Sequence, residues 1–211
     1  MTVKPFYNSL YCTLFTLLVL MTACSQPIPQ LAQLPNDAVL LAFGDSITHG
    51  NGAGSEESYP AVLASLSGLT VINAGYPGEV TEGGRERLAA LLDRHQPALL
   101  LLCHGGNDLL RKIDSVVTRR NLDAMIDMAH TRSIPVLLIG VPQPGLFMLE
   151  SAELYRAAAT RHGLLYDGDI LPDVYSDNGL KADQIHPNAA GYRKIAAAIY
   201  RLMQDSGLLP G

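Results

Sequence analysis

Short apolar runs alternate along the chain with longer segments in which apolar residues recur every three to four positions. Five of the runs contain only three to six residues, which is typical of strands buried on both faces of a parallel sheet. The pattern therefore predicts an α/β domain whose sheet has five parallel strands. The five runs are Ala38–Phe43, Leu69–Asn73, Ala98–Cys103, Pro135–Ile139 and Leu164–Tyr166.

The segments between the runs have the period of amphipathic helices. Pro60 suits the first turn of a helix over residues 60–67, and the last helix follows Pro187 and Asn188. Strands and helices thus alternate, which predicts a single doubly wound domain that binds its ligand at the carboxyl ends of the strands. The other periodic positions are Leu88, Leu91, Leu92 and His95, then Leu122, Met125, Ile126 and Ala129, and finally Tyr192, Ile195, Ala196, Ile199, Leu202 and Met203.

The first 23 residues are typical of an export signal. They contain one charged residue, Lys4, followed by an apolar stretch over Leu10–Met21. That stretch is shorter than the roughly 20 residues that a membrane-spanning helix needs. Residues 1–23 are therefore predicted to be a signal peptide, 24–36 a Pro- and Gln-rich tether, and 37–211 the folded domain.

The signal ends at Thr22-Ala23-Cys24, which resembles the signal box of bacterial lipoproteins. In that class the Cys receives a diacylglyceryl group and becomes the first residue of the mature chain. The resemblance implies lipidation of Cys24 and an exported, membrane-anchored lipoprotein that faces the periplasm or the cell surface. An ordinary cleavage site and an uncleaved anchor are the alternatives.

Composition narrows the possible partners. The 211 residues include 15 Lys and Arg against 20 Asp and Glu, a net charge of −5, and no dense basic run. Nucleic acid is therefore not expected as a partner. Three Cys residues cannot form a disulfide framework. Cys12 lies in the signal, Cys24 is the predicted lipidation site, and Cys103 is predicted to be a buried, inert thiol.

Small and polar residues follow the first three predicted strands. Ser46 comes after the first strand in Gly44-Asp45-Ser46, where a tight turn can present its hydroxyl above the sheet. Gly78 follows the second strand and offers an unshielded N–H, and Asn107 follows the third strand and offers a neutral amide donor. Because parallel strands end at one edge, we expect these groups to lie together. Each also has a purely structural interpretation, as a helix cap or a plain turn.

A carboxylate and an imidazole precede the last predicted helix. In Asp183-Gln184-Ile185-His186 the carboxylate comes three residues before the imidazole, close enough to orient the ring. A serine nucleophile needs such a base and a carboxylate that stabilises its cation. Asp183 and His186 are therefore the candidate partners of Ser46. The other histidines are His95, His130 and His162 at the ends of predicted helices, and His49 and His104 near the predicted cleft.

Together these motifs resemble those of the SGNH or GDSL-type hydrolases, and the resemblance covers roughly residues 38–205. The family marks are a Ser in Gly-Asp-Ser, a Gly after the second strand, an Asn in Gly-x-Asn-Asp and a His in Asp-x-x-His. They fall on Ser46, Gly78, Asn107 and His186, with Asp183. The resemblance implies a three-layer α/β/α, flavodoxin-like fold and a triad of Ser46, His186 and Asp183. It also implies an oxyanion hole made by the N–H groups of Ser46 and Gly78 and the side chain of Asn107, without a metal or cofactor.

The motifs match most closely the branch that contains periplasmic thioesterases, lysophospholipases and arylesterases. The matching segments are 59–61, 105–108 and 183–188. Two departures stand out. Pro77 occupies the place of the usual Ser before Gly78, and Cys103 occupies a place where some members have an acidic or apolar residue.

The resemblance implies a monomeric serine esterase that hydrolyses carboxylic esters or thioesters, with a small acyl ester or a lysophospholipid-like molecule as substrate. A deacetylase for O-acetylated carbohydrate or cell-wall polymer is one alternative, and a catalytically silent, lipid-anchored binding protein is another. The loops that would select the acyl group are 47–58, 109–114 and Val141–Met148. The last of these is unusually apolar, which suits either an acyl-chain wall or local packing.

Overall fold

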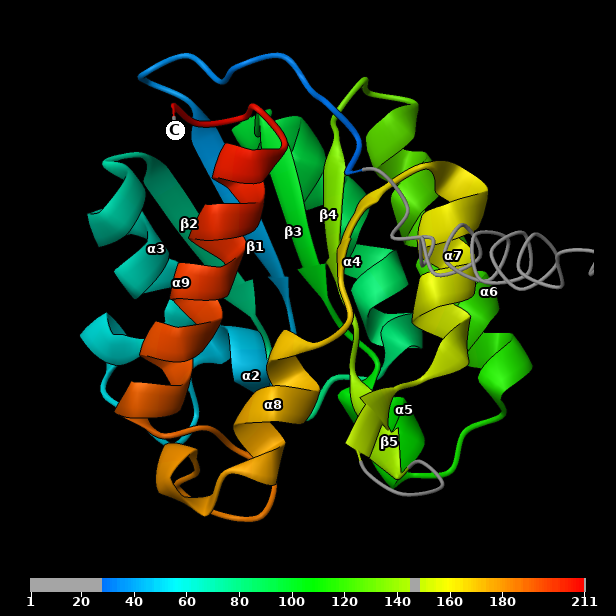
Figure 1. The fold of residues 1–211 in the computed structure, drawn as a ribbon. Helices are drawn as coiled ribbons and strands as arrows, with labels where there is room; N and C mark the ends of the chain where they lie inside the picture. The colour runs from blue at the N-terminus through cyan, green and yellow to red at the C-terminus, as the bar shows by residue number, and fades with distance from the viewer. Residues whose placement is uncertain (1–27, 145–148, 211) are drawn as a thin grey trace, which may run out of the picture.

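The computed structural model describes residues 28–144 and 149–210. Its central sheet has five parallel strands in the order β2-β1-β3-β4-β7 (Figure 1). Each predicted apolar run forms one of these strands, and the ends agree within two residues. The five-stranded parallel sheet is therefore confirmed. The strands are β1 (Val39–Gly44), β2 (Thr70–Gly75), β3 (Leu99–Cys103), β4 (Val136–Ile139) and β7 (Leu165–Asp167).

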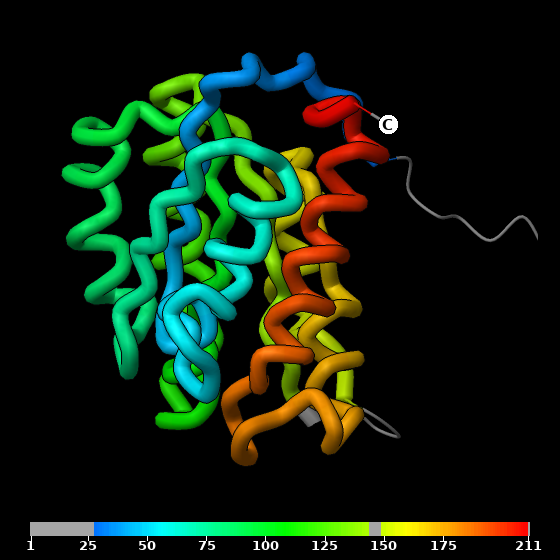
Figure 2. The backbone as a smooth tube through the Cα atoms, turned by 90° about the vertical axis from the view of Figure 1, so that its left-hand side faces the viewer, coloured from blue at the N-terminus to red at the C-terminus, as the bar shows by residue number. Residues whose placement is uncertain are grey.

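Helices cover both faces of the sheet and make three layers (Figures 1 and 2). One face carries α3 (Tyr59–Ser67) and α9 (Ala189–Asp205), which pack against each other. The other face carries α4 (Thr81–His95), α6 (Ser115–His130) and α7 (Glu153–His162). This arrangement confirms the predicted three-layer α/β/α fold, whose strand order is that of flavodoxin-like domains.

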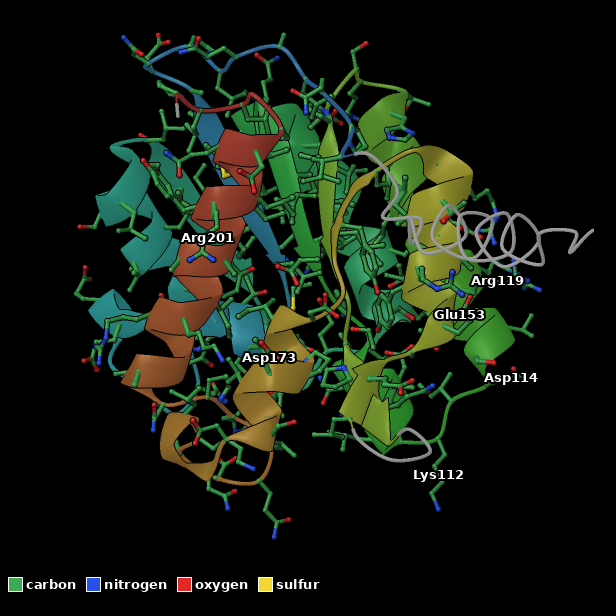
Figure 3. All side chains as sticks on the ribbon, in the orientation of Figure 1. Lys112, Asp114, Arg119, Glu153, Asp173 and Arg201 are labelled. Atoms are coloured by element: carbon green, nitrogen blue, oxygen red, sulfur yellow. The ribbon has the colours of Figure 1, made fainter. Side chains whose placement is uncertain are left out.

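The central strands supply much of the core. Strand β3 is buried along its whole length, and β1 is buried from Leu40 onward. Because side chains on both faces of these strands are covered, the strands have continuous apolar sequences rather than alternating ones. The helices keep charged side chains such as Glu153 and Arg201 on their exposed outer faces (Figure 3).

Short elements that the apolar pattern does not predict surround the carboxyl ends of the strands (Figure 1). They are too short to show a helical period or a strand alternation. They are α2 (Ser46–His49), α5 (Gly106–Leu110), α8 (Ile170–Ser176), the antiparallel pair β5 (Pro142–Pro144) and β6 (Leu149–Ser151), and the 3-10 turns η1 (Ser55–Glu57) and η2 (Asn178–Leu180).

The first described residues lie at the opposite end of the sheet (Figure 1). Residues 28–36 form no helix or strand, and they pack along the C-terminal segment, where the Leu31 N–H donates to the Ser206 carbonyl oxygen at 2.9 Å. This part of the predicted tether is attached to the domain. The predicted signal peptide and Cys24 lie outside the described residues. Among the residues that are described, no helix combines the length and apolar character needed to cross a membrane.

Candidate active site

Ser46 is the first residue of α2, directly beyond the end of β1. The turn before it is tight, since a Cβ atom on Gly44 would overlap the Cys103 carbonyl oxygen of the neighbouring strand. Asp45 caps the helix by accepting a hydrogen bond from the Ile47 N–H at 3.1 Å. The half-buried Ser46 is thereby held at the carboxyl edge of the sheet, where the sequence predicts it.

Asp183, His186 and Ser46 form a continuous hydrogen-bonded series. Asp183 Oδ1 accepts from the backbone N–H groups of Ile185 and His186, each at 2.8 Å. Its second oxygen lies 2.8 Å from His186 Nδ1, and His186 Nε2 lies 3.1 Å from Ser46 Oγ. The hydrogen bond from His186, followed by that from the Ile185 N–H, lowers the pKa of the Asp183 carboxyl below its ordinary value. The structure therefore brings together the three residues predicted as nucleophile, base and orienting acid.

Gly78 lies in the turn that follows β2. The Glu79 N–H closes this turn on the Tyr76 carbonyl oxygen at 3.2 Å, and Gly78 has a φ of 78°, which glycine adopts without strain. Arg111 donates to the Gly78 carbonyl oxygen at 2.8 Å and fixes the orientation of that peptide. Within the described chain, no protein group accepts from the N–H of Gly78 or of Ser46. Both donors are available to a ligand.

Asn107 is the second residue of α5 and comes from the loop after β3. Its Nδ2 donates to the Glu79 carbonyl oxygen at 3.0 Å and to Asp45 Oδ2 at 3.3 Å. Burial raises the pKa of the Asp45 carboxyl, against the lowering effect of hydrogen bonds from the backbone N–H groups of Ile47 and Gly106. To serve an oxyanion, the Asn107 amide would exchange the longer of its two bonds, the one to Asp45.

A cavity of about 360 Å³ opens beside Ser46 and Asn107. All three predicted cleft loops contribute to it. The 109–114 loop provides Leu109 and Leu110, the third loop provides Val141 and Pro142, and the 47–58 loop provides only Ile47. Residues 145–148 of the third loop lie outside the described chain. A further part of the wall was not predicted from the sequence, and it comes from residues before and within the Asp183 motif. Those lining residues are Tyr175, Lys181, Gln184 and Ile185.

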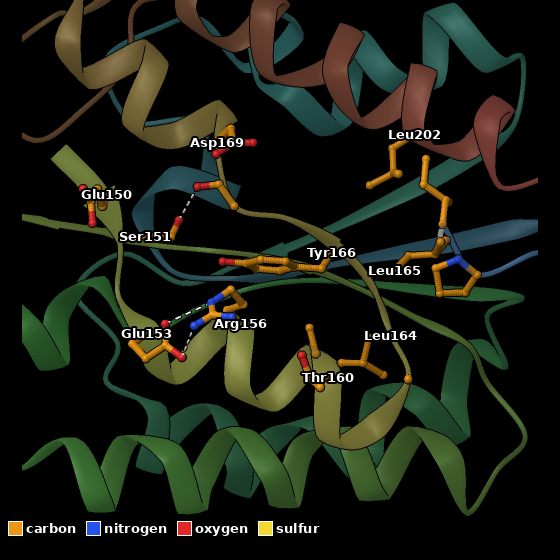
Figure 4. A pocket seen from close by; sticks show the side chains of 15 residues that line it. Glu150, Ser151, Glu153, Arg156, Thr160, Leu164, Leu165, Tyr166, Asp169 and Leu202 are labelled. Atoms are coloured by element: carbon orange, nitrogen blue, oxygen red, sulfur yellow. Dashed lines mark hydrogen bonds and ion pairs between the residues drawn. The ribbon is translucent and has the colours of Figure 1, made fainter. Parts of the chain in front are cut away.

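A second, larger cavity of about 700 Å³ lies along the outer edge of β7 (Figure 4). Tyr166 lies in its centre, near Ser151 and the ion pair of Arg156 with Glu153 (Figure 4). None of the residues predicted for catalysis lines it. Size therefore does not identify the reactive site, because Ser46, the predicted nucleophile, lines the smaller cavity.

The remaining histidines occupy other positions. His95, His130 and His162 are the last residues of α4, α6 and α7, which confirms their predicted places at helix ends. His49 is exposed, and its Nδ1 lies 2.9 Å from the Asn51 side-chain oxygen. It does not line the cavity beside Ser46. His104 is completely buried.

Cys103 is a free, buried thiol, as the sequence predicts. Burial raises its pKa well above the ordinary value, so the thiolate form is disfavoured. Across residues 28–144 and 149–210, no group of three or more His, Cys, Asp or Glu side chains is arranged to hold a metal ion.

A serine, an imidazole and a carboxylate in hydrogen-bonded series at the carboxyl edge of a parallel sheet have the arrangement of an α/β serine hydrolase. The comparison with protein families narrows this class. The chain belongs to the GDSL-like Lipase/Acylhydrolase family, whose model matches residues 42–194. It is thus an ester hydrolase of the GDSL type.

Similarity to individual proteins is consistent with this family assignment. Esterase TesA of Pseudomonas aeruginosa is 30% identical over 180 residues, which cover 81% of this chain and 90% of that protein. Thioesterase 1/protease 1/lysophospholipase L1 of Escherichia coli K12 is 30% identical over 156 residues, or 71% of this chain and 75% of that protein. A crystal structure of TesA matches with a TM-score of 0.72 at 29% identity, covering 79% of this chain and 98% of the other.

Proposed function

We propose that this protein is a serine esterase that hydrolyses carboxylic esters or thioesters through an acyl-enzyme on Ser46. The observation that carries the proposal is the series Asp183–His186–Ser46, with distances of 2.8 and 3.1 Å between successive side chains. A serine hydroxyl is a weak nucleophile on its own, and a hydrogen-bonded imidazole activates it.

The proposed reaction has two halves. Ser46 Oγ attacks the acyl carbonyl carbon while His186 Nε2 takes the hydroxyl proton, which His186 then gives to the departing alcohol or thiol. Water next attacks the acyl-enzyme, giving one proton to His186, and the carboxylic acid leaves as Ser46 regains its hydrogen. Asp183 orients the imidazole and stabilises its cation in both halves.

The negative oxygen that forms on the acyl carbon needs hydrogen-bond donors. The free N–H groups of Ser46 and Gly78 and the amide of Asn107 are the proposed donors. One such donor contributes about 10²–10³-fold to kcat. The turn at Gly78 and the loop at Asn107 hold these donors in place before substrate binds, so the reaction requires little reorientation beyond the exchange of the hydrogen bond from Asn107 to Asp45.

The acyl group is proposed to enter the cavity beside Ser46, whose walls are mainly apolar. The names of two relatives, a thioesterase and lysophospholipase and an esterase, agree with a substrate that carries an acyl chain. The apolar part of the wall comprises Ile47, Leu109, Leu110, Val141, Pro142, Leu149 and Ile185.

The direct test is hydrolysis of p-nitrophenyl esters from acetate to laurate by the wild type and by Ser46→Ala. We expect the wild type to hydrolyse these esters and to prefer acyl chains longer than acetate. Ser46→Ala should lose this activity. Activity confined to acetate would favour the deacetylase alternative. A folded wild type that hydrolyses none of the esters would contradict the proposal and favour a binding protein.

We further propose that Cys24 carries the lipid that anchors the exported chain, because the signal ends at Thr22-Ala23-Cys24. Cys24→Ser should move the protein out of the membrane fraction or stop its processing, whereas Cys12→Ser should change neither. Unchanged processing and membrane association of Cys24→Ser would refute lipidation at this position.

A further inference from the structure

One buried imidazole in the site has no part in the proposed reaction. His104 has no exposed surface, and its Nδ1 accepts a hydrogen bond from the Gly105 N–H at 2.9 Å. The ring hydrogen therefore resides on Nε2, which lies 3.0 Å from Glu79 Oε2 and donates to it. Both ring nitrogens are occupied by protein groups, so this histidine is not available to take a proton from a substrate or from Ser46.

The two partners of His104 come from the two loops that carry proposed oxyanion donors. Glu79 directly follows Gly78, and Gly105 comes two residues before Asn107. The Glu79 carbonyl oxygen also accepts from Asn107 Nδ2 at 3.0 Å. The His104 ring thus joins the loop after β2 to the loop after β3. The contact is close in sequence to Gly78 on the first loop and to Asn107 on the second.

Hydrogen bonds from other residues hold both members of the His104–Glu79 pair in place. Arg87 Nε donates to both Glu79 carboxylate oxygens at 2.8 and 2.9 Å, and its Nη2 donates to the carbonyl oxygens of Gly44 and Ala74. Burial raises the pKa of the Glu79 carboxyl, but hydrogen bonds from His104 and Arg87 outweigh it, and the net shift is downward. On the other side, the buried Tyr155 hydroxyl donates to the His104 carbonyl oxygen at 2.8 Å.

Helix α4 leaves room for the ring. A Cβ atom on Gly84 would overlap His104 Nε2 and lie 2.8 Å from its Cδ2. A glycine inside a helix costs about 1 kcal/mol relative to alanine. The presence of glycine at this place in α4 therefore agrees with a requirement for the imidazole at position 104, independently of the hydrogen bonds.

We propose that His104 is a positioning residue that sets the spacing of the Gly78 and Asn107 oxyanion donors by clamping their two loops together. The inference rests on the proposed function, because it gives those donors their role. The ring acts only through them, so its removal should weaken stabilisation of the transition state and leave ground-state binding nearly unchanged.

The test is a double-mutant cycle between His104 and Asn107, read by kcat and KM on one p-nitrophenyl ester. His104→Leu should lower kcat about 10–100-fold, less than loss of a whole donor, and change KM less than about threefold. His104→Gln should recover most of the lost activity, because its amide can accept from Gly105 and donate to Glu79. In an Asn107→Ala background, His104→Leu should lower kcat by a clearly smaller factor than in the wild type.

Controls separate positioning from general loss of structure. His130→Leu removes an exposed imidazole at the far end of α6 and should leave kcat and KM unchanged. If His104→Leu does not fold, His104→Asn takes its place in the cycle, since its shorter amide can satisfy only one of the two neighbours. Thermal unfolding of each variant shows that the active fraction is folded.

The outcomes distinguish this inference from the function on which it rests. An active wild type whose kcat is unchanged by His104→Leu, or factors for His104 and Asn107 that multiply independently, would overturn the positioning role alone. A folded wild type without ester hydrolysis would overturn the proposed function and this inference with it. Non-additive factors together with recovery in His104→Gln would support both.

Discussion

The carboxyl edge of the sheet holds two histidine–carboxylate pairs that differ in their surroundings. His186 lies 2.8 Å from Asp183 on an open loop, where 54% of the Asp183 side chain is exposed. His104 lies 3.0 Å from Glu79 in the interior, where the exposed fractions are 0% and 10%. The chemical groups and the distances are nearly the same. Only the first imidazole has a serine hydroxyl on its second nitrogen.

The difference shows that the neighbours of an imidazole, rather than its carboxylate partner, decide what it can do. The second nitrogen of His186 contacts a group that can give up a proton, whereas that of His104 contacts the Gly105 backbone N–H, which cannot. An open loop also admits substrate and water. We therefore assign the proposed chemistry to the more exposed pair, and stability and spacing to the buried one.

The largest effect should come from His186→Ala, which removes the proposed base. We expect kcat/KM to fall on the order of 10⁴-fold or more, with little change in thermal stability because the loop is open. The loss in His104→Leu should be at least a hundredfold smaller. Parallel kinetics on p-nitrophenyl esters check the ranking, and a larger loss in His104→Leu than in His186→Ala would reverse the assignment.

The second-largest effect should come from Asp183→Asn. Its kcat/KM should fall about 10²–10⁴-fold, because the oxyanion donors remain. The pKa of Asp183 lies below its ordinary value, so the wild-type carboxylate stays charged well below neutral pH. The ratio of wild-type to variant kcat/KM should therefore remain large at every pH from 5 to 9. A ratio that falls to one anywhere in this range would exclude Asp183 as the orienting acid.

Glu79→Gln, in the buried pair, should reduce the stability of the fold more than it reduces the rate of ester hydrolysis. The folded state lowers the pKa of Glu79, so its charge stabilises the fold above the ordinary pKa near 4.3, and this contribution is lost as the pH falls through the lower folded value. At pH 7 the variant should lose about 1–3 kcal/mol of unfolding free energy. Thermal melts should show the difference from wild type shrinking below pH 4, and a constant difference would contradict the assigned role of the charge.

Tyr155→Phe should have the smallest effect. It removes the donor to the buried His104 carbonyl oxygen while keeping the ring, at a cost of about 1 kcal/mol. The melting temperature should fall by roughly 2–4 °C. Activity should fall less than in His104→Leu, and a greater loss would mean that the hydroxyl, rather than the imidazole, holds the loop.

The same contrast explains how much the sequence could predict. Asp183 and His186 lie three residues apart, so local spacing reveals their pairing, whereas Glu79 and His104 lie 25 residues apart and meet only through the fold. The five strands were predictable because burial on both faces leaves continuous apolar runs. The short helices α2, α5 and α8 and the wall at Lys181 and Ile185 were not predicted, since tertiary contacts rather than periodicity fix them.

The proposed function requires that Ser46 is the nucleophile and that His186 activates it. Peptide mass spectrometry after reaction with a fluorophosphonate tests this most directly, because only an activated hydroxyl attacks such a probe. We expect one adduct, on the peptide that contains Ser46. The adduct should be absent in Ser46→Ala, nearly absent in His186→Ala and still formed in His104→Leu. An adduct on another residue, or equal labelling of the wild type and Ser46→Ala, would contradict it.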